Sequence, residues 1–489
     1  MNRSTETVSG SANLQKAPET DAFKWACLAA GLVILIGSLC IPSPAGLKPA
    51  AVRTLAVMVT TVLWWVTEVL PIPVTAMMVP ILVHALGIMP LAATIREGFG
   101  DSLIPFLVGV LGLSFAWTAS GLGKRITYLI LSFSGTNVTR VVGVYLWVSF
   151  IISMFITDVA VVAMMIPLVI GLLSTIDDKP GASNMGRALM MAIMFGATLG
   201  GVCTPAGVSS NIITMAFITR NAKLGISFLQ WSRIATPVFV AINFVTWWLI
   251  LKLFPPGMKS LPYGRDTIET ELKKLGGWTP KEITTLLVFL AAVLLWLTSD
   301  LTDLPIAFVS LLILGGLSLP GIGALRKWRD LEKGIEWGAV LLVVGGFALG
   351  IAAMNSGLAA WVAKNALAPM AALPSFLQPL AVVLLVAVDS LGFSSFGAAA
   401  SVNVPFIIAY AQQNGFPVLA LAMSAGFAAS THFILVTESP CFVLPYAYGY
   451  FSFKDLAKIG AIVTLLCAIL ISVWMVIVGM PAGVPLPVK

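Results

Sequence analysis

Residues 154–167 read MFITDVAVVAMMIP and contain a single ionisable side chain, Asp158. The residues before this stretch, YLWVSFIIS, and those after it have the composition of a bilayer interior. An acid at the centre of a membrane helix costs about 2.5–3.5 kcal/mol even on insertion scales, so such groups face a bundle interior or a water-filled cavity. The stretch therefore predicts a functional carboxyl group inside a helical membrane protein.

The composition supports this reading along the whole chain. Of 489 residues, 58% are hydrophobic and 10% are charged, against about 25% charged in a soluble domain. Apolar runs of nearly the length that crosses about 30 Å of hydrocarbon recur from end to end. The net charge of +7 comes from Lys and Arg in short loops, which is a topology signal and not a nucleic-acid surface. The five cysteines lie in apolar segments without CxxC spacing and predict neither a disulfide nor a metal site.

Hydropathy predicts a polytopic topology, in which several apolar runs are too long or too interrupted by Gly and Pro to be single helices. The expected spans are 23–41, 52–69, 72–90, 126–135, 141–174, 188–219, 233–254, 281–298, 303–320, 358–370, 376–412, 416–447 and 457–480. Basic loops at 252–282 and 324–336 flank the acidic sequence SDLTDLP, with Asp300 and Asp303. Because basic loops stay in the cytoplasm, we expect both loops and the N-terminus there. We expect an integral protein of the bacterial inner (plasma) membrane.

Two halves of the chain repeat one order of features. The Gly-rich stretches 101–126 and 334–363 each include a polar turn followed by Gly-Leu. Further along each half come TDVAVVAMMIP (157–167) or SFGAAASVNVP (395–405), and then a polar break, GGVCTPAGVSSN (200–211) or STHFILVTESP (430–440). Repeats with broken helices in corresponding places indicate a transporter with its binding site near the bilayer midplane. Helix N-termini at such breaks attract anions, and freed carbonyls coordinate cations.

The residues also resemble a known family. TEVLPIPVTAMMVPILVHALGIM (67–89) is similar to the opening signature of the divalent anion:sodium symporters, and GYFSFKDLAKIG (449–460) resembles the entry to their last helix. The two Gly-Leu-closed stretches resemble the family's two re-entrant hairpins. The resemblance implies an all-α polytopic membrane protein, an inverted-repeat elevator-type transporter with about 11 transmembrane helices and two re-entrant hairpins. It further implies homodimerisation and contact with membrane lipid.

The expected organisation follows from the repeat and the loops. The predicted segments are a cytoplasmic tail (1–22), scaffold helices (23–95), a first inverted repeat (96–254), a cytoplasmic linker (255–280), further scaffold helices (281–333) and a second inverted repeat (334–489). Each repeat is expected to contain a hairpin and broken helices.

The family's Ser-Asn-Thr motif lies ten residues before a Pro, which here gives Thr157-Asp158-Val159 and Ser395-Phe396-Gly397. The resemblance therefore implies substrate contacts from the hydroxyl, amide and imidazole groups at the breaks. The predicted substrate-binding residues are Thr157, Thr204, Ser209, Ser210, Asn211, Ser394, Ser395, Thr431, His432, Thr437 and Ser439. The predicted cation-binding or coupling residues are Asp158, Gly201, Ser395 and Glu438.

The altered motifs leave the coupling ion open. Asp158 can bind Na⁺ with a formal charge, or it can be protonated, since burial favours the neutral form of a carboxyl group. Phe396 offers no oxygen, so the second sodium site of the family is expected to be missing or altered. A carboxyl group merely satisfied by neighbouring helices is the plainer reading of Asp158 and of Glu438, and core packing is the plainer reading of His432.

These observations predict a secondary active transporter of small organic or divalent anions, dicarboxylate-like, coupled to Na⁺ or H⁺. An anion/anion antiporter of the same fold is the alternative, because Thr431-His432 resembles the exchanging members of the family; an anion channel is a more distant one. An enzyme is not expected, because the sequence contains no HExxH, Cys/His metal cluster, Ser/His/Asp set or phosphate loop. We expect no cofactor and no nucleic-acid partner.

Overall fold

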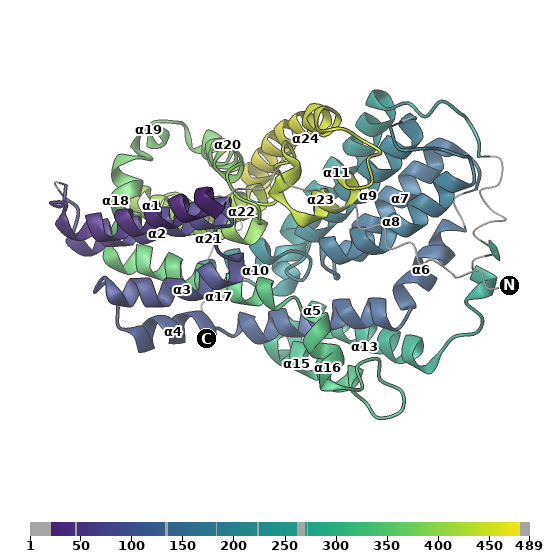
Figure 1. The fold of residues 1–489 in the computed structure, drawn as a ribbon, viewed down its shortest axis with the longest axis horizontal. Coiled ribbons are helices and arrows are strands. Elements are labelled where there is room, and N and C mark those ends of the chain that lie inside the picture. Colours follow the sequence, from purple (N-terminus) through teal and green to yellow (C-terminus); the bar gives the residue numbers. More distant parts are fainter. Residues whose placement is uncertain are drawn as a thin grey trace.

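The computed structural model describes residues 21–44, 46–132, 135–181, 183–222, 224–261, 269–270 and 272–479. In these residues every regular element is helical, and the only extended pairing is one antiparallel bridge between Asn137 and Ser260 (Figure 1). The predicted all-α class is confirmed. Most of the predicted tail 1–22, part of the predicted linker 255–280 and the last ten residues lie outside the described residues.

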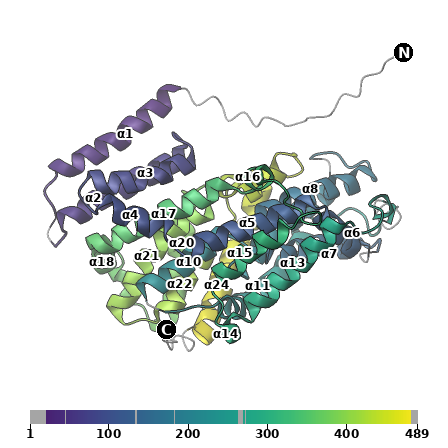
Figure 2. The same ribbon diagram turned by 90° about the horizontal axis from the view of Figure 1, so that it is seen from below.

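The first four helices form one margin of the molecule. They are α1 (Asp21–Cys40), α2 (Pro49–Thr67), α3 (Ile72–Ala85) and α4 (Leu91–Phe99). α1 lies beside α2, away from the centre (Figure 2). Gly31 permits this contact, because a side-chain carbon there would come within 2.7 Å of Trp64 Cε2. The Trp64 indole N–H donates a hydrogen bond to the Cys27 carbonyl at 3.3 Å. α1 otherwise exposes large apolar side chains such as Trp25, which suits contact with lipid.

The next seven helices belong to the first half of the chain. They are α5 (Leu103–Ala119), α6 (Leu122–Leu131), α7 (Val138–Ser153), α8 (Asp158–Ser174), α9 (Asn184–Val202), α10 (Ser209–Asn221) and α11 (Phe228–Leu253). The predicted runs 141–174 and 188–219 are thus each divided in two. α9 is buried nearly all round, as expected for an apolar helix at the centre of a bundle. Gly196 and Gly200 of α9 form a GxxxG spacing against the backbone of α7, a geometry that brings membrane helices close together.

The remaining helices follow the linker. They are α13 (Pro280–Leu297), α14 (Ser299–Thr302), α15 (Ile306–Leu317), α16 (Trp328–Gly334), α17 (Trp337–Ser356), α18 (Leu358–Asn365), α19 (Ala368–Ala371), η1 (Ser375–Leu377), α20 (Gln378–Ser390), α21 (Phe396–Asn414), α22 (Val418–Ala428), η2 (Val436–Glu438), α23 (Pro440–Tyr446), α24 (Phe453–Trp474) and η3 (Met475–Gly479). The predicted runs 376–412 and 416–447 are divided as well.

The two helical hairpins lie elsewhere than the sequence predicted. The Gly-rich stretch 334–363 contains α17, a single 20-residue helix long enough to cross a membrane, and α5 forms most of 101–126. Gly121 and Gly357 adopt left-handed backbone conformations and join these helices to the short α6 and α18. In these two stretches the glycines belong to long, closely packed helices and do not form a hairpin turn.

The hairpins are instead α7–α8 and α20–α21. In the first, the Tyr145 hydroxyl donates to the Leu168 carbonyl at 3.2 Å. In the second, the Tyr410 hydroxyl donates to Gln378 Oε1 at 2.7 Å. Each bond joins residues at similar distances before and after the intervening turn, so both helix pairs run antiparallel. The two turns contain the Thr157 and Ser395 motifs, and Pro167 and Pro405 occupy matching positions in α8 and α21.

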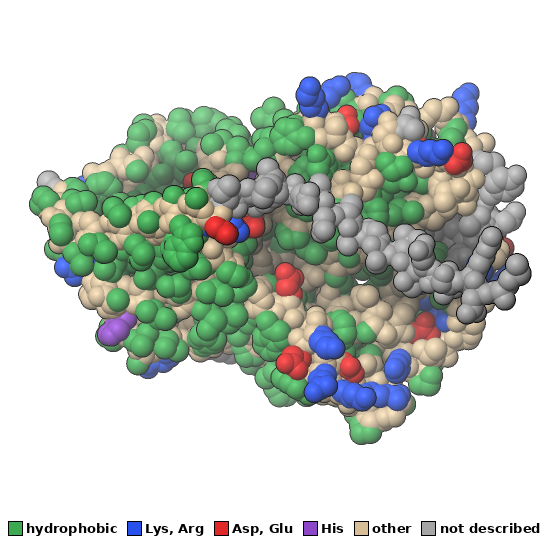
Figure 3. Space-filling view, viewed as in Figure 1, with side chains coloured by type: hydrophobic (Ala, Val, Ile, Leu, Met, Phe, Trp, Pro, Cys, Tyr) green, Lys and Arg blue, Asp and Glu red, His purple; other side chains and the backbone are tan. Residues whose placement is uncertain are grey.

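Among the described residues, seven helices are long and apolar enough to cross a membrane, or eight if the bent pair α4–α5 is one span. Hydrophobic side chains cover much of the molecular surface around α1 to α3, whereas Lys and Arg gather over α16 and at the opposite edge (Figure 3). Seven spanning helices with an apolar exterior identify an integral membrane protein. The expected count of about 11 spans stays an expectation from the family resemblance.

Candidate functional site: a cavity at the hairpin turns

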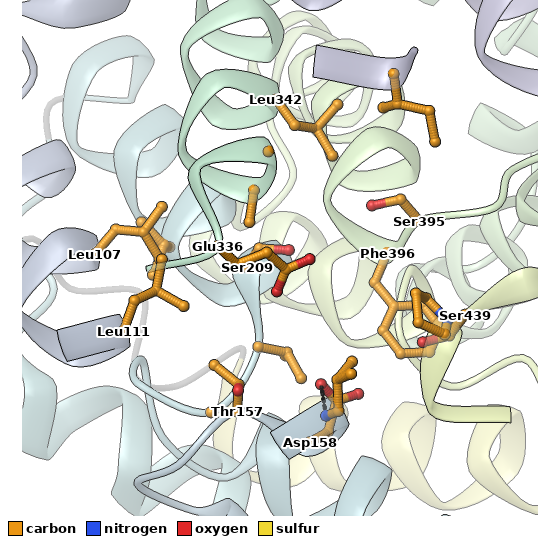
Figure 4. Close-up of a pocket in the computed structure, with 18 of the residues that line it drawn as sticks. Leu107, Leu111, Thr157, Asp158, Ser209, Glu336, Leu342, Ser395, Phe396 and Ser439 are labelled. Carbon is orange, nitrogen blue, oxygen red and sulfur yellow. Dashed lines mark hydrogen bonds between the residues drawn. The ribbon is translucent and has the colours of Figure 1, made fainter. Parts of the chain in front are cut away.

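One cavity of about 240 Å³ lies where the two hairpin turns meet the broken helices (Figure 4). The turn of α7–α8 contributes Thr157 and Asp158, and the turn of α20–α21 contributes Ser394 and Ser395. Leu107 and Leu111 of α5 and Leu342 of α17 form an apolar part of the wall. Residues more than 200 positions apart in the sequence are therefore brought together at one place.

Helix N-termini converge on this cavity. The N-terminal residues of α8, α10 and α21 line it, as does Glu336 at the start of α17. The side chains at the N-cap positions of these four helices make no capping hydrogen bond. The first N–H groups of a helix lack partners within the helix, and the helix dipole makes this end positive. The arrangement thus brings positively polarised helix ends to the cavity from both halves of the chain, although at α8 the Val159 amide already donates to Asp158.

Asp158 is the first residue of α8 and is 6% exposed. Its Oδ1 accepts a hydrogen bond from the Val159 amide at 2.9 Å, whereas its Oδ2 is buried without a close hydrogen bond among the described residues; the Cys441 thiol lies near this carboxyl group. A buried polar atom without a partner is rare in native proteins and is often explained by an ion or water at the site. Thr157, whose hydroxyl bonds to the Ser114 hydroxyl at 3.3 Å, lines the cavity beside this carboxyl group.

The second half places an aromatic ring where the first half places Asp158. Phe396 is the first residue of α21, lines the cavity and is buried. Its ring packs edge-on against His432, with centroids 5.5 Å apart. His432 itself is fully buried and does not line the cavity. The cavity is therefore chemically asymmetric, with an acid at one hairpin turn and an aromatic wall at the other.

The structure brings some of the predicted site residues to the cavity and places others behind it. Those that line it are Thr157, Asp158, Ser209, Ser394, Ser395 and Ser439. Those that do not are Gly201, Thr204, Ser210, Asn211, Thr431, His432, Thr437 and Glu438.

Several residues behind the cavity support the break between α9 and α10. The Asn211 amide group donates to the carbonyls of Gly201 (3.0 Å), Val202 (3.3 Å) and Thr204 (2.7 Å). The Thr204 hydroxyl donates to the Met154 carbonyl at the first hairpin turn. These bonds occupy carbonyls that the end of α9 leaves free and fix the break against the hairpin.

The second break is supported in a similar way. The Ser430 hydroxyl bonds to that of Ser210, and the Thr431 hydroxyl donates to the Phe427 carbonyl at 2.9 Å. Glu438 is buried; its Oε1 accepts from the Leu435 amide at 2.9 Å, and its Oε2 has no partner among the described residues. Thr437 is exposed.

Sequence reasoning missed Glu336. This residue directly precedes α17, is exposed, and projects its carboxyl group into the space between Leu111 and Phe396 (Figure 4). It interacts electrostatically with Asp158. The only signal in the sequence was an acid at the boundary between a basic loop and a long apolar run, which is equally typical of an interfacial residue.

The described residues contain no group of three or more His, Cys, Asp or Glu side chains that could hold a transition metal. Spanning helices, paired helical hairpins and a polar cavity at helix breaks define the class: a membrane transporter. The chain belongs to the sodium:sulfate symporter family, whose transmembrane-region model matches residues 22–484. This match confirms the resemblance to the divalent anion:sodium symporters.

Named relatives agree with this assignment. The chain is 27% identical to the sodium-dependent dicarboxylate transporter SdcS of Staphylococcus saprophyticus, over 94% of this chain and 93% of the relative. It is 26% identical to SdcS of Staphylococcus aureus with the same coverage, and 26% identical to a membrane protein of Cupriavidus necator over 90% of both chains. The family and the named transporters are not enzymes.

The fold is also similar to that of a solved structure. The YdaH transporter of Alcanivorax borkumensis superposes with a TM-score of 0.53 over 95% of this chain and 99% of its own, at 16% identity. This likeness supports a membrane transporter fold.

Proposed function

We propose that this protein is a secondary active transporter of small organic anions of the dicarboxylate type, driven by a cation gradient. The observation that carries the proposal is the convergence of uncapped helix N-termini on one hydroxyl-lined cavity. Carboxylates, sulfonates and phosphates are the groups that such helix ends bind. The named relatives, which are sodium-dependent dicarboxylate transporters, support the same substrate class.

Na⁺ is the proposed coupling ion and Asp158 its ligand. The free Oδ2 of Asp158 is buried at a hairpin turn beside the cavity, where a bound cation would neutralise it and raise affinity for a nearby anion. A proton on the same carboxyl group is the competing coupling ion. Of the other predicted cation ligands, Ser395 lines the cavity, whereas Gly201 already accepts from Asn211. Glu438 has a free buried oxygen behind the cavity.

The proposed movement is of the elevator type. In it, the hairpins and broken helices of the segments 96–254 and 334–489 would move with the bound anion against scaffold helices of 23–95 and 281–333. The family resemblance supports this, and it also supports a homodimer. The positive-inside pattern supports a bacterial inner membrane location with the N-terminus and the basic loop before Glu336 in the cytoplasm.

An anion/anion antiporter is the second candidate. Phe396 favours it, because the ring replaces the oxygen-bearing side chain that the family motif has at this position, and so removes a ligand for a second cation. A channel of the same fold is a weaker third candidate, since the cavity is small and bounded by two hairpin turns.

Uptake by the purified protein in liposomes separates these candidates. With radiolabelled succinate and aspartate outside, an inward Na⁺ gradient should drive accumulation above equilibrium, and replacing Na⁺ by K⁺ should abolish it. Uptake that needs anions inside the liposomes and ignores both Na⁺ and pH would establish exchange and refute cation coupling. A current that no unlabelled anion competes with would establish a channel.

A further inference from the structure

The charge of the cavity lining sets a condition on the solute. Among the described residues, two ionisable side chains line the cavity, Asp158 and Glu336, and both are acids; the described lining includes no Lys, Arg or His. The two carboxyl groups come from different helices and interact electrostatically. When both groups are ionised, they repel a dianion, and the helix N-termini alone oppose this repulsion unless cations enter as well.

The two acids differ in what can reach them. Asp158 is 6% exposed, with an unpartnered oxygen buried at a hairpin turn, which suits a small, fully dehydrated ion. Glu336 is exposed, and its side chain makes no hydrogen bond or ion pair in the described part of the chain. Its carboxyl group projects into the open part of the cavity, opposite the Phe396 ring (Figure 4). A group carried by the solute can reach this position.

We propose, on the basis of the proposed anion transport, that the solute carries an ammonium group in addition to its acid groups and that Glu336 binds this ammonium group. Na⁺ then neutralises the charge of Asp158, and the ammonium group of the solute neutralises the charge of Glu336. The acid groups of the solute lie at the N-termini of α10 and α21, beside Ser209, Ser394 and Ser395. Glu336 is therefore a specificity-determining residue that selects amino acids over plain carboxylic acids.

The Phe396 side chain fits the same assignment. An aromatic face within about 6 Å attracts an ammonium group, whereas a dicarboxylate gains nothing from it. The second hairpin turn thus offers a surface that suits the nitrogen-bearing, partly apolar side of an amino acid. The hydroxyl groups of Ser394 and Ser395 on the same turn, and that of Ser209, suit its acid side.

Binding to matched pairs of compounds tests the proposal. Each pair differs only by an amino group: succinate and aspartate, propionate and β-alanine, ethanesulfonate and taurine. Calorimetric titration of the full-length protein at pH 7.5 in NaCl should show at least one amino compound binding about tenfold or more tightly than its partner. Glu336→Gln should bring that ratio close to one, and Glu336→Asp should retain part of it.

Glu332→Gln is the matched control, because Glu332 is an exposed acid four residues earlier that does not line the cavity. It should leave the ratio unchanged. Melting temperatures of all variants establish that they are folded, as expected for substitutions at exposed positions.

Plain acids that bind as tightly as their amino partners in every pair would overturn the inference and leave the proposed function intact. A Glu336→Gln variant that keeps the amino preference would also overturn it. So would a change in Na⁺ dependence in that variant without a change in amino preference, because Glu336 would then be an ion ligand. If none of the six compounds binds with or without Na⁺, the proposed function and the inference fail together.

Discussion

Gly200 connects the packing of α9 to the geometry of the cavity, and Gly200→Ala tests that connection. A methyl carbon at this position would overlap the Phe150 carbonyl oxygen and lie 2.7 Å from Phe150 Cα, whereas real contacts stay above 3.0 Å. α7 must therefore move away from α9. Phe150 lies near the end of α7, only a few residues before the turn that holds Thr157 and Asp158, so the displacement reaches the cavity.

The expected size follows from two opposing effects. Replacing Gly by Ala within a helix favours the helix by about 0.8–1.0 kcal/mol, and forcing extra volume into a packed contact costs about 1–3 kcal/mol. Gly200→Ala should lose stability on balance. A misplacement of 1 Å can reduce rates about 100-fold, and for a smaller shift we expect a roughly tenfold loss of transport.

Gly171→Ala is the matched control, because Gly171 lies in α8 of the same hairpin and has no atom within 4 Å of the added carbon. It should raise stability slightly and leave transport unchanged. Thermal unfolding by tryptophan fluorescence and liposome uptake measure both effects. A Gly200→Ala protein as stable and as active as Gly171→Ala would refute the close α7–α9 contact and its link to the site.

Three further substitutions test separate contacts. Arg125→Met leaves Glu282, its partner at 2.8 Å, buried without its counterion. We expect the free energy of unfolding, measured by denaturant unfolding, to fall by about 3–5 kcal/mol. Adding Glu282→Gln should restore part of this loss. Asn211→Ala removes three hydrogen bonds to carbonyls at the α9–α10 break. It should lower the free energy of unfolding by about 1–3 kcal/mol and weaken anion binding. Unchanged titration and melting curves would contradict this. Gly31→Leu should push α1 away from Trp64, which limited proteolysis should report as faster cleavage between α1 and α2.

The sequence predicted the class of fold well because its signals are strong and local. Long apolar runs, charged loops and polar breaks at Thr157, Ser395 and Thr204 all correspond to real features. The hairpins were misplaced because the Gly-rich stretches 101–126 and 334–363 resemble the family's re-entrant hairpins, whereas in the structure they contain the long helices α5 and α17. Gly in a membrane helix also permits close contact between helices. The hydrogen bonds of Tyr145 and Tyr410 across antiparallel helix pairs show which segments are the hairpins.

The site itself was less predictable because the same residue types serve two purposes at a helix break. Asn211 and Thr204 have the chemistry of substrate ligands, yet their side chains bond to backbone carbonyls that the break leaves free. Glu336 was missed because its role depends on the fold bringing the start of α17 opposite the hairpin turns, which no spacing in the sequence encodes.

The Na⁺ dependence of uptake by Asp158→Asn tests most directly whether Asp158 binds the coupling ion. Uptake of radiolabelled succinate and aspartate into liposomes is measured for the wild type and the variant, in Na⁺, in K⁺ and at low pH. We expect Na⁺-driven accumulation by the wild type. Uptake by the variant should no longer respond to the Na⁺ gradient, although the variant remains folded. Uptake by the variant with the Na⁺ and pH dependence of the wild type would contradict the role of Asp158 as the coupling group.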